Sequence, residues 1–140
     1  MTDAIEAAIQ VATSGLQAQS TRLRVVAENM ANANSTAVVP GGDPYSRKTI
    51  TFEDEIDRAA GVDLVRVKDI GSDPTPYKIE YDPSNPAADE RGFVKMPNVN
   101  IMTEMADMRE ANRSYMADLE VVKQGRQLYT MTVDLLRNSA

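Results

Sequence analysis

The sequence predicts a mainly α-helical protein, in which long N- and C-terminal helices pair as an antiparallel coiled coil and are joined by a small proline-rich β or irregular insert. Three observations predict this fold: the placement of proline, a heptad pattern of apolar residues at each end, and alternating apolar and polar residues in between. With 140 residues, of which 42% are apolar, the chain is long enough to bury the core of one ordinary domain.

Proline divides the chain into three parts. All seven prolines lie between positions 40 and 97, together with five of the seven glycines. Because proline inside a helix costs about 3 kcal/mol or more, long helices are favoured only at the two ends. We therefore expect an N-terminal helical segment at residues 1–36, an insert with short strands and turns at 37–98, and a C-terminal helical segment at 99–140.

The N-terminal segment carries apolar residues in a 3–4 alternation over four heptads, which predicts one apolar helix face. Gly15 and Gln19 weaken this stripe. Three asparagines between positions 29 and 34 favour the end of the helix there, so it should contain about 28 residues and measure about 42 Å. The predicted subunit-interface positions are Ile5, Ile9, Ala12, Leu16, Leu23, Val26 and Met30.

The C-terminal segment repeats this alternation and predicts a helix of about 38 residues. Asn98 or Asn100 is the expected N-cap, with Pro97 just outside the helix. Helices this long at both ends are typical of a coiled coil, since an independent globular helix averages about 11–12 residues. The predicted interface positions are Ile101, Met105, Met108, Tyr115, Leu119, Val122, Tyr129, Val133 and Leu136.

An apolar heptad is also what a core-facing helix of a small bundle shows. Only two long helices are predicted here, however, and the proline-rich insert is expected to cover them poorly. A two-helix hairpin then leaves apolar surface exposed, which indicates that another chain covers it. Five methionines in the C-terminal helix favour adaptable packing against several neighbours over a metal-binding stripe.

The insert is expected to contain short strands and turns. Residues 48–52 and 77–81 alternate apolar and polar side chains, and 62–68 form a less regular β-branched run. Asp-Pro and Asn-Pro pairs open turns, and the acidic run at 53–57 is interpreted as a solvated acidic turn. The turn-opening positions are Asp43, Asp73, Asp82 and Asn85.

Composition excludes several functional classes. The chain has no Cys and no His, so disulfides, thiolate nucleophiles and Ser-His triads are absent. A net charge of −6 argues against nucleic acid and anionic membranes as main partners. No apolar run approaches the roughly 18 residues of a membrane-spanning helix, and the start of the chain is acidic where a signal peptide is basic. We expect no catalytic residue, no cofactor and no metal site.

Two blocks of sequence resemble known proteins. Residues 14–25 and 28–36 resemble the N-terminal signature of the flagellar axial proteins, a family of rod, hook and hook-associated subunits, although Ala37-Val38-Val39 stands where several relatives carry Thr-Pro-Gly-Tyr. The block at 81–99 narrows the resemblance to the proximal-rod subunits. The matching family positions are Asn29, Ala31, Asn32, Tyr81, Pro83, Asn85, Pro86, Gly92, Pro97 and Asn98.

This resemblance implies a structural subunit of the proximal rod of the bacterial flagellar basal body, assembled helically into a periplasmic drive shaft that transmits motor torque. It implies export through the flagellar type III apparatus without a cleavable signal peptide. The expected partners are other copies, other rod subunits, basal-body ring and export-gate components, and an export chaperone or apparatus, with no nucleic acid and no direct membrane insertion. Another axial subunit, such as the companion proximal-rod protein, and an unrelated coiled-coil adaptor are the alternatives.

Overall fold

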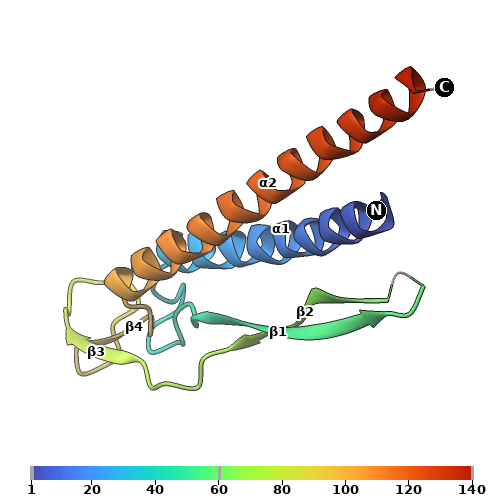
Figure 1. Ribbon diagram of the computed structural model, residues 1–140. Coiled ribbons are helices and arrows are strands. Elements are labelled where there is room, and N and C mark those ends of the chain that lie inside the picture. Colours follow the sequence, from blue (N-terminus) through green and yellow to red (C-terminus); the bar gives the residue numbers. More distant parts are fainter. Residues whose placement is uncertain (1, 60, 140) are drawn as a thin grey trace. The chain divides into compact units, whose positions relative to one another are not determined.

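The structure, a computed structural model, describes residues 2–59 and 61–139. It contains two long helices joined by a β insert (Figure 1). Of its strands, β1 pairs with β2 and β3 pairs with β4, in separate two-stranded sheets. The helices contain 30 and 38 residues, so about half of the chain is helical, as predicted. The elements are α1 Thr2–Ala31, β1 Lys48–Asp57, β2 Val62–Ser72, β3 Lys78–Tyr81, β4 Phe93–Met96 and α2 Ile101–Asn138.

Asparagines lie at the end of α1 and at the start of α2, as the sequence predicts. The backbone N–H and the Nδ2 of Asn32 both donate to the carbonyl of Glu28, at 3.1 and 2.9 Å, at the end of α1. At the start of α2, Asn100 Oδ1 accepts the N–H groups of Met102 and Thr103 at 3.0 and 3.3 Å. Asn100 is therefore the N-cap of α2, because its side chain satisfies N–H groups that have no partner within the helix.

The three predicted strands are confirmed, but the acidic run is not a turn. Residues 53–57 continue β1, and Glu53 accepts a hydrogen bond from Arg66 of β2 at 2.6 Å. Opposite charges on neighbouring strands stabilise the pairing of the two strands. The acidic residues alone do not show that a basic residue lies opposite them. Strand β4 was not predicted, since four residues are too few to show alternation. It pairs antiparallel with β3, with Tyr81 opposite Phe93.

Asx turns form at three of the four predicted turn openers. The side-chain oxygen of Asp73 accepts the N–H of Thr75 at 2.8 Å. Asp82 and Asn85 likewise accept an N–H two residues further on, at 3.2 and 2.9 Å. The fourth, Asp43, differs: it lies in an irregular segment, and its carboxylate accepts a hydrogen bond from Lys95 Nζ at 2.7 Å.

The chain forms two compact units, and each helix contributes to both. The first unit comprises 2–22, 51–59, 61–69 and 110–139. There, a Cβ at Gly15 would lie 2.4 Å from Asp118 Oδ2, and one at Gly125 would lie 2.6 Å from Ile9 Cγ1. Because the higher-numbered residue of α1 meets the lower-numbered residue of α2, the two helices run antiparallel. The buried apolar side chains here are small or medium in size: Ala12, Ala18, Ala111 and Val122.

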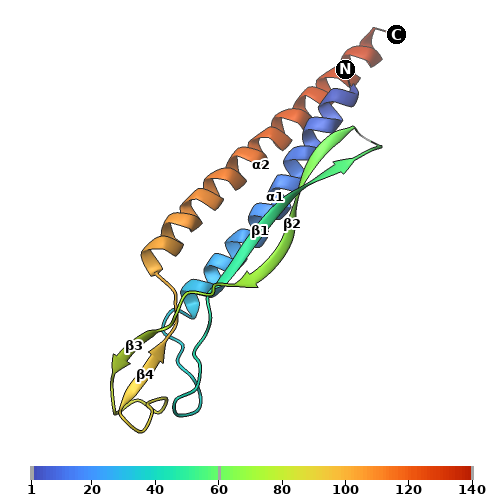
Figure 2. The same cartoon turned by 90° about the horizontal axis from the view of Figure 1, so that it is seen from below.

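The β1–β2 hairpin of the first unit lies beside α1 (Figure 2). The backbone N–H of Val65 donates to Ser14 Oγ at 3.2 Å, and Gln10 Nε2 donates to Asp57 Oδ2 at 2.6 Å. These contacts attach both strands of the hairpin to the outer face of the first helix.

The second unit, residues 23–50 and 70–109, has a more developed core. Apolar side chains of α1 are buried together with several from the insert. The expectation that the insert is a poor cover is therefore wrong for this unit, because four of its apolar residues are buried. The buried residues are Val25, Val26 and Ala33 from α1 and the turn after it, Pro44, Ala87, Val94 and Pro97 from the insert, and Val99 just before α2.

Candidate functional site

A buried polar cluster occupies the second unit and is centred on Asn29, a family-motif residue that is 1% exposed. Its Oδ1 accepts hydrogen bonds from Tyr45 Oη and from the Lys48 N–H, both at 2.8 Å. Its Nδ2 donates to the Lys48 carbonyl at 2.9 Å and to Glu104 Oε2 at 3.1 Å. The amide thus ties the end of α1 to the loop before β1 and to the start of α2.

Glu104, at 0% exposure, is the buried anion of the cluster. Its Oε1 lies 2.5 Å from Arg47 Nε, and Arg47 also reaches Asp73 Oδ2 at 3.3 Å. Burial lowers the pKa of Arg47, but the hydrogen bonds and charges of Glu104 and Asp73 outweigh that effect and raise it. Both oxygens of the buried carboxylate therefore have donors, which is what an ionised group needs in a protein interior.

Asn98 extends the cluster into the insert. Its Oδ1 accepts the N–H of Arg47 at 2.8 Å, and its Nδ2 donates to the carbonyls of Asp73 and Thr75 at 3.1 and 2.9 Å. The pKa of Asp73 is lowered, chiefly by its hydrogen bonds from Thr75 and then by Arg47. The pKa of Tyr45 is raised, mainly by burial and then by the nearby carboxylates Glu28 and Glu104. These groups are held in place by one another, which indicates a structural role.

The remaining family-motif positions shape the turn between β3 and β4 and the end of α1. Gly92 has a φ of 83°, and a Cβ there would lie 3.0 Å from both Pro83 Cβ and Tyr81 Cε2. The residue must therefore be glycine for both conformational and spatial reasons. Asn85 forms the Asx turn already described and Pro97 is buried, whereas Pro86 is exposed. Ala31 and Asn32 end α1.

The predicted interface positions divide by exposure. Those of α1 are buried or half-buried. On α2, Val122 is buried and Met108, Tyr115 and Leu119 are half-buried. The rest of the predicted α2 positions are exposed: Ile101, Met105, Tyr129, Val133 and Leu136.

Sequence reasoning missed a row of α2 residues spaced by seven, in which Glu104, Ala111 and Gly125 are buried and Asp118 is half-buried. This row was overlooked because it lacks large apolar side chains. Its signal is the recurrence, at a spacing of seven, of residues that are not large and apolar, of which Ala111 and Gly125 are small enough to allow close approach. Burial raises the pKa of Asp118. Arg47 was also missed, since a single basic residue in a loop shows no pattern.

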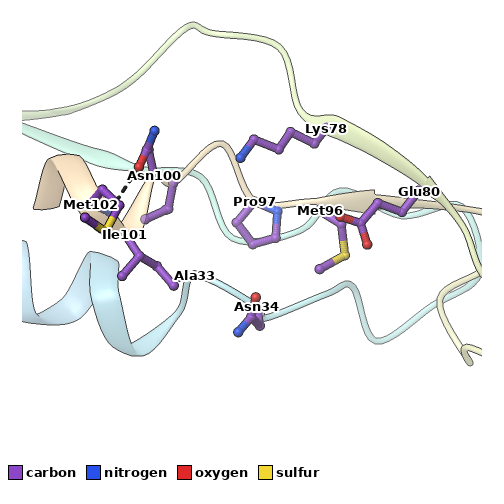
Figure 3. Close-up of a pocket in the computed structure, with 10 residues that line it drawn as sticks. Ala33, Asn34, Lys78, Glu80, Met96, Pro97, Asn100, Ile101 and Met102 are labelled. Carbon is purple, nitrogen blue, oxygen red and sulfur yellow. Dashed lines mark hydrogen bonds between the residues drawn. The ribbon is translucent and has the colours of Figure 1, made fainter.

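A hollow of about 230 Å³ lies in the second unit, bordered by the turn after α1, by β3 and by the start of α2 (Figure 3). Lys78 and Glu80 line it together with Met96, Ile101 and Met102. Within the ranges that the structure describes, no three acidic side chains come together as a potential metal site. Neither described helix is both long and apolar enough to cross a bilayer.

Comparison with known proteins finds relatives along nearly the whole chain. Residues 9–37 match the family described as flagella basal body rod protein, and residues 90–135 match the C-terminal region described for flagellar basal body rod FlgEFG proteins. The flagellar basal-body rod protein FlgC of Agrobacterium fabrum is 58% identical over 137 residues, covering 98% of this chain and 99% of the relative. FlgC of Escherichia coli is 41% identical, covering 89% and 92%. FlgC of Borreliella burgdorferi is 35% identical, covering 92% and 95%.

Proposed function

Because this chain belongs to the family of flagellar basal-body rod proteins named FlgC, it is a structural subunit of the basal-body rod and not an enzyme, and we propose that it builds the proximal part of that rod. In this proposal the subunits assemble helically into a periplasmic shaft that carries torque from the motor. The near-complete match to FlgC relatives at both ends of the chain is the observation that carries it.

We further propose a route by which the subunit reaches that position. The subunit leaves the cytoplasm through the flagellar type III apparatus, without a cleavable signal peptide and with the help of an export chaperone or the apparatus itself. Its partners are other copies, other rod subunits, and ring and export-gate components of the basal body.

Assembly uses the apolar surface that the single chain leaves uncovered. Exposed large apolar side chains are frequent on α2, among them Met102, Met131, Leu135 and Leu136, at 73, 61, 70 and 64% exposure. Full burial of a Leu or Met side chain contributes about 1.5–3 kcal/mol. When contacts between two different surfaces of a subunit do not close into a ring, they generate a helical tube.

The two sets of predicted interface positions then have different roles. The α1 residues and the covered α2 residues hold the helices together as an antiparallel coiled coil. The exposed α2 residues, namely Ile101, Met105, Tyr129, Val133 and Leu136, meet neighbouring subunits. Stiffness against torque arises because each such contact is repeated along the shaft.

Fractionation tests this function. The protein should copurify with detergent-extracted basal bodies, and a deletion strain should neither build a rod nor swim. Its appearance outside the cytoplasm should require the flagellar exporter. A cytosolic pool that persists unchanged without the exporter and never joins basal bodies would contradict the proposal and favour an adaptor.

A further inference from the structure

An apolar groove lies between the helices of the first unit. It has a volume of about 310 Å³ and is floored by small residues, which leave space that larger side chains would fill. Ile5 is half-buried in its wall, and Val121 and Leu128, at 45 and 53% exposure, form its outer edge on α2. The lining residues are Ala4, Ile5, Ala8, Val121, Gln124, Gly125 and Leu128.

The last turns of α2 extend past the first described turn of α1. The contacts of Gly15 with Asp118 and of Gly125 with Ile9 set the antiparallel register, which places Thr2 opposite about residue 132. Residues 133–138 therefore have no described α1 residue opposite them, and Val133 and Leu136 remain exposed at 39 and 64%. Because they are three residues apart, these two side chains share one face of the helix.

The groove and this protruding face lie on opposite flanks of α2. Asp118, Gly125 and Thr132 form one row along α2, spaced by seven residues. Val121 and Leu128 each lie three residues after a member of this row, whereas Leu136 lies four residues after one. A spacing of three and a spacing of four fall on opposite sides of a helical position. A contact between the two flanks is therefore heterologous and can continue from copy to copy without closing.

The two flanks of α2 also differ in charge. The groove side carries exposed Glu110, Glu120 and Asp134 on α2, and one base, Arg113. The protruding side carries Lys123, Arg126 and Arg137, all exposed, and within 110–139 it has no acidic residue. Two copies placed flank to flank thus bring opposite charges together, whereas like flanks repel.

We propose that the C-terminal turns of α2 in one copy dock in the groove between α1 and α2 of a second copy. Val133 and Leu136 fill the space beside Ala4, Ala8 and Gly125, and Arg137 approaches Glu120, whose Oε1 accepts a hydrogen bond from the groove residue Gln124 at 3.3 Å. The proposal rests on the proposed function, because it supplies the subunit-to-subunit contact that a rod requires.

The cysteine-free sequence allows a direct crosslinking test. Two single-cysteine copies, A8C and L136C, are expressed together, basal bodies are isolated, and disulfides are formed with a mild oxidant. We expect an A8C–L136C dimer, which can arise only between copies. The matched control replaces L136C by L135C, a neighbouring and similarly exposed leucine on the groove flank, and its crosslink should be largely lost.

The charges are tested by exchange. E120K or R137E alone should lower the yield of the crosslink about two- to fivefold, which corresponds to the ~0.5–1 kcal/mol of an exposed ion pair, and the double exchange should restore it. If the variants join basal bodies but the L135C copy crosslinks as well as the L136C copy, the docking proposal is wrong while the rod assignment stands. If even the unmodified chain is absent from basal bodies, the proposed function fails and this inference with it.

Discussion

The ion pair between Arg47 and Glu104 gives the sharpest prediction for the fold. Arg47→Leu removes the cation and leaves a carboxylate at 0% exposure without its charged partner. Breaking a buried pair from one side typically costs 3–5 kcal/mol, so we expect about 3 kcal/mol here, since the Arg47 side chain is 23% exposed. That loss would be a large fraction of the total stability of a small domain.

A double-mutant cycle separates the charge from the packing. Glu104→Leu together with Arg47→Leu replaces both partners, so no buried charge is left alone and much of the loss should be recovered. The assay is urea unfolding of the purified full-length chain followed by circular dichroism, with free energies extrapolated to water.

Arg66→Leu is the matched control. Its partner Glu53 is 30% exposed and Arg66 itself 57%, so solvent screens the pair and the loss should be far smaller than for Arg47→Leu. If Arg47→Leu costs no more than this control, or if the double variant is as unstable as the sum of the singles, the buried pair does not stabilise the second unit as argued.

Further predictions concern the helices. Leu23→Asp places a charge on the half-buried face of α1 and should abolish motility at normal protein levels, whereas exposed Arg24→Asp should swim; normal swimming of the first variant would defeat the interface assignment. Gly125→Val should destabilise the first unit by about 1–3 kcal/mol, because its Cβ would lie 2.6 Å from Ile9 Cγ1; an unchanged melting temperature would contradict this. Burial raises the pKa of Asp118, so the wild type loses stability as the pH rises from about 3.8 through that raised pKa. Asp118→Asn should therefore be more stable than the wild type at neutral pH, by less than ~1 kcal/mol. An equal difference in stability at pH 3 would show that burial of the charged carboxylate is not the reason.

The helices could be predicted from sequence because local rules determine them. Proline excludes long helices between positions 40 and 97, and the asparagines at 32 and 100 end α1 and cap α2 where the pattern indicates. The turns opened by Asp73, Asp82 and Asn85 follow for the same reason, since each depends on contacts two residues away.

The buried cluster could not be predicted, because its members are distant in sequence. Arg47 and Glu104 are 57 residues apart, and Asn29 and Glu104 are 75 apart. No periodic pattern links them, and each residue by itself looks like an ordinary polar side chain. The acidic run of β1 was misassigned for the same reason, since the position of Arg66 on the neighbouring strand decides how Glu53 is satisfied.

The close contacts between the two helices could not be predicted either, because they depend on which residues of α1 and α2 lie opposite each other. Gly15 was interpreted as a defect in an apolar stripe, but the structure places Asp118 where its Cβ would be. A stripe of large apolar residues does not reveal these contacts, because the residues that meet there are small or polar. Recurrence at a spacing of seven, irrespective of size, would have identified this row on α2.

Hydrogen exchange on the purified monomer tests the central claim most directly. The account predicts slow exchange at 23–31 and 101–109, where the second unit has its buried cluster and core. We predict faster exchange, through local opening of a folded but less stable unit, at 2–22 and 110–139, where mostly small side chains are buried, and slow exchange there only after incorporation into basal bodies. Full protection of residues 5–30 and of the C-terminal half of α2 in the isolated monomer would contradict the claim that neighbouring subunits complete this part of the fold.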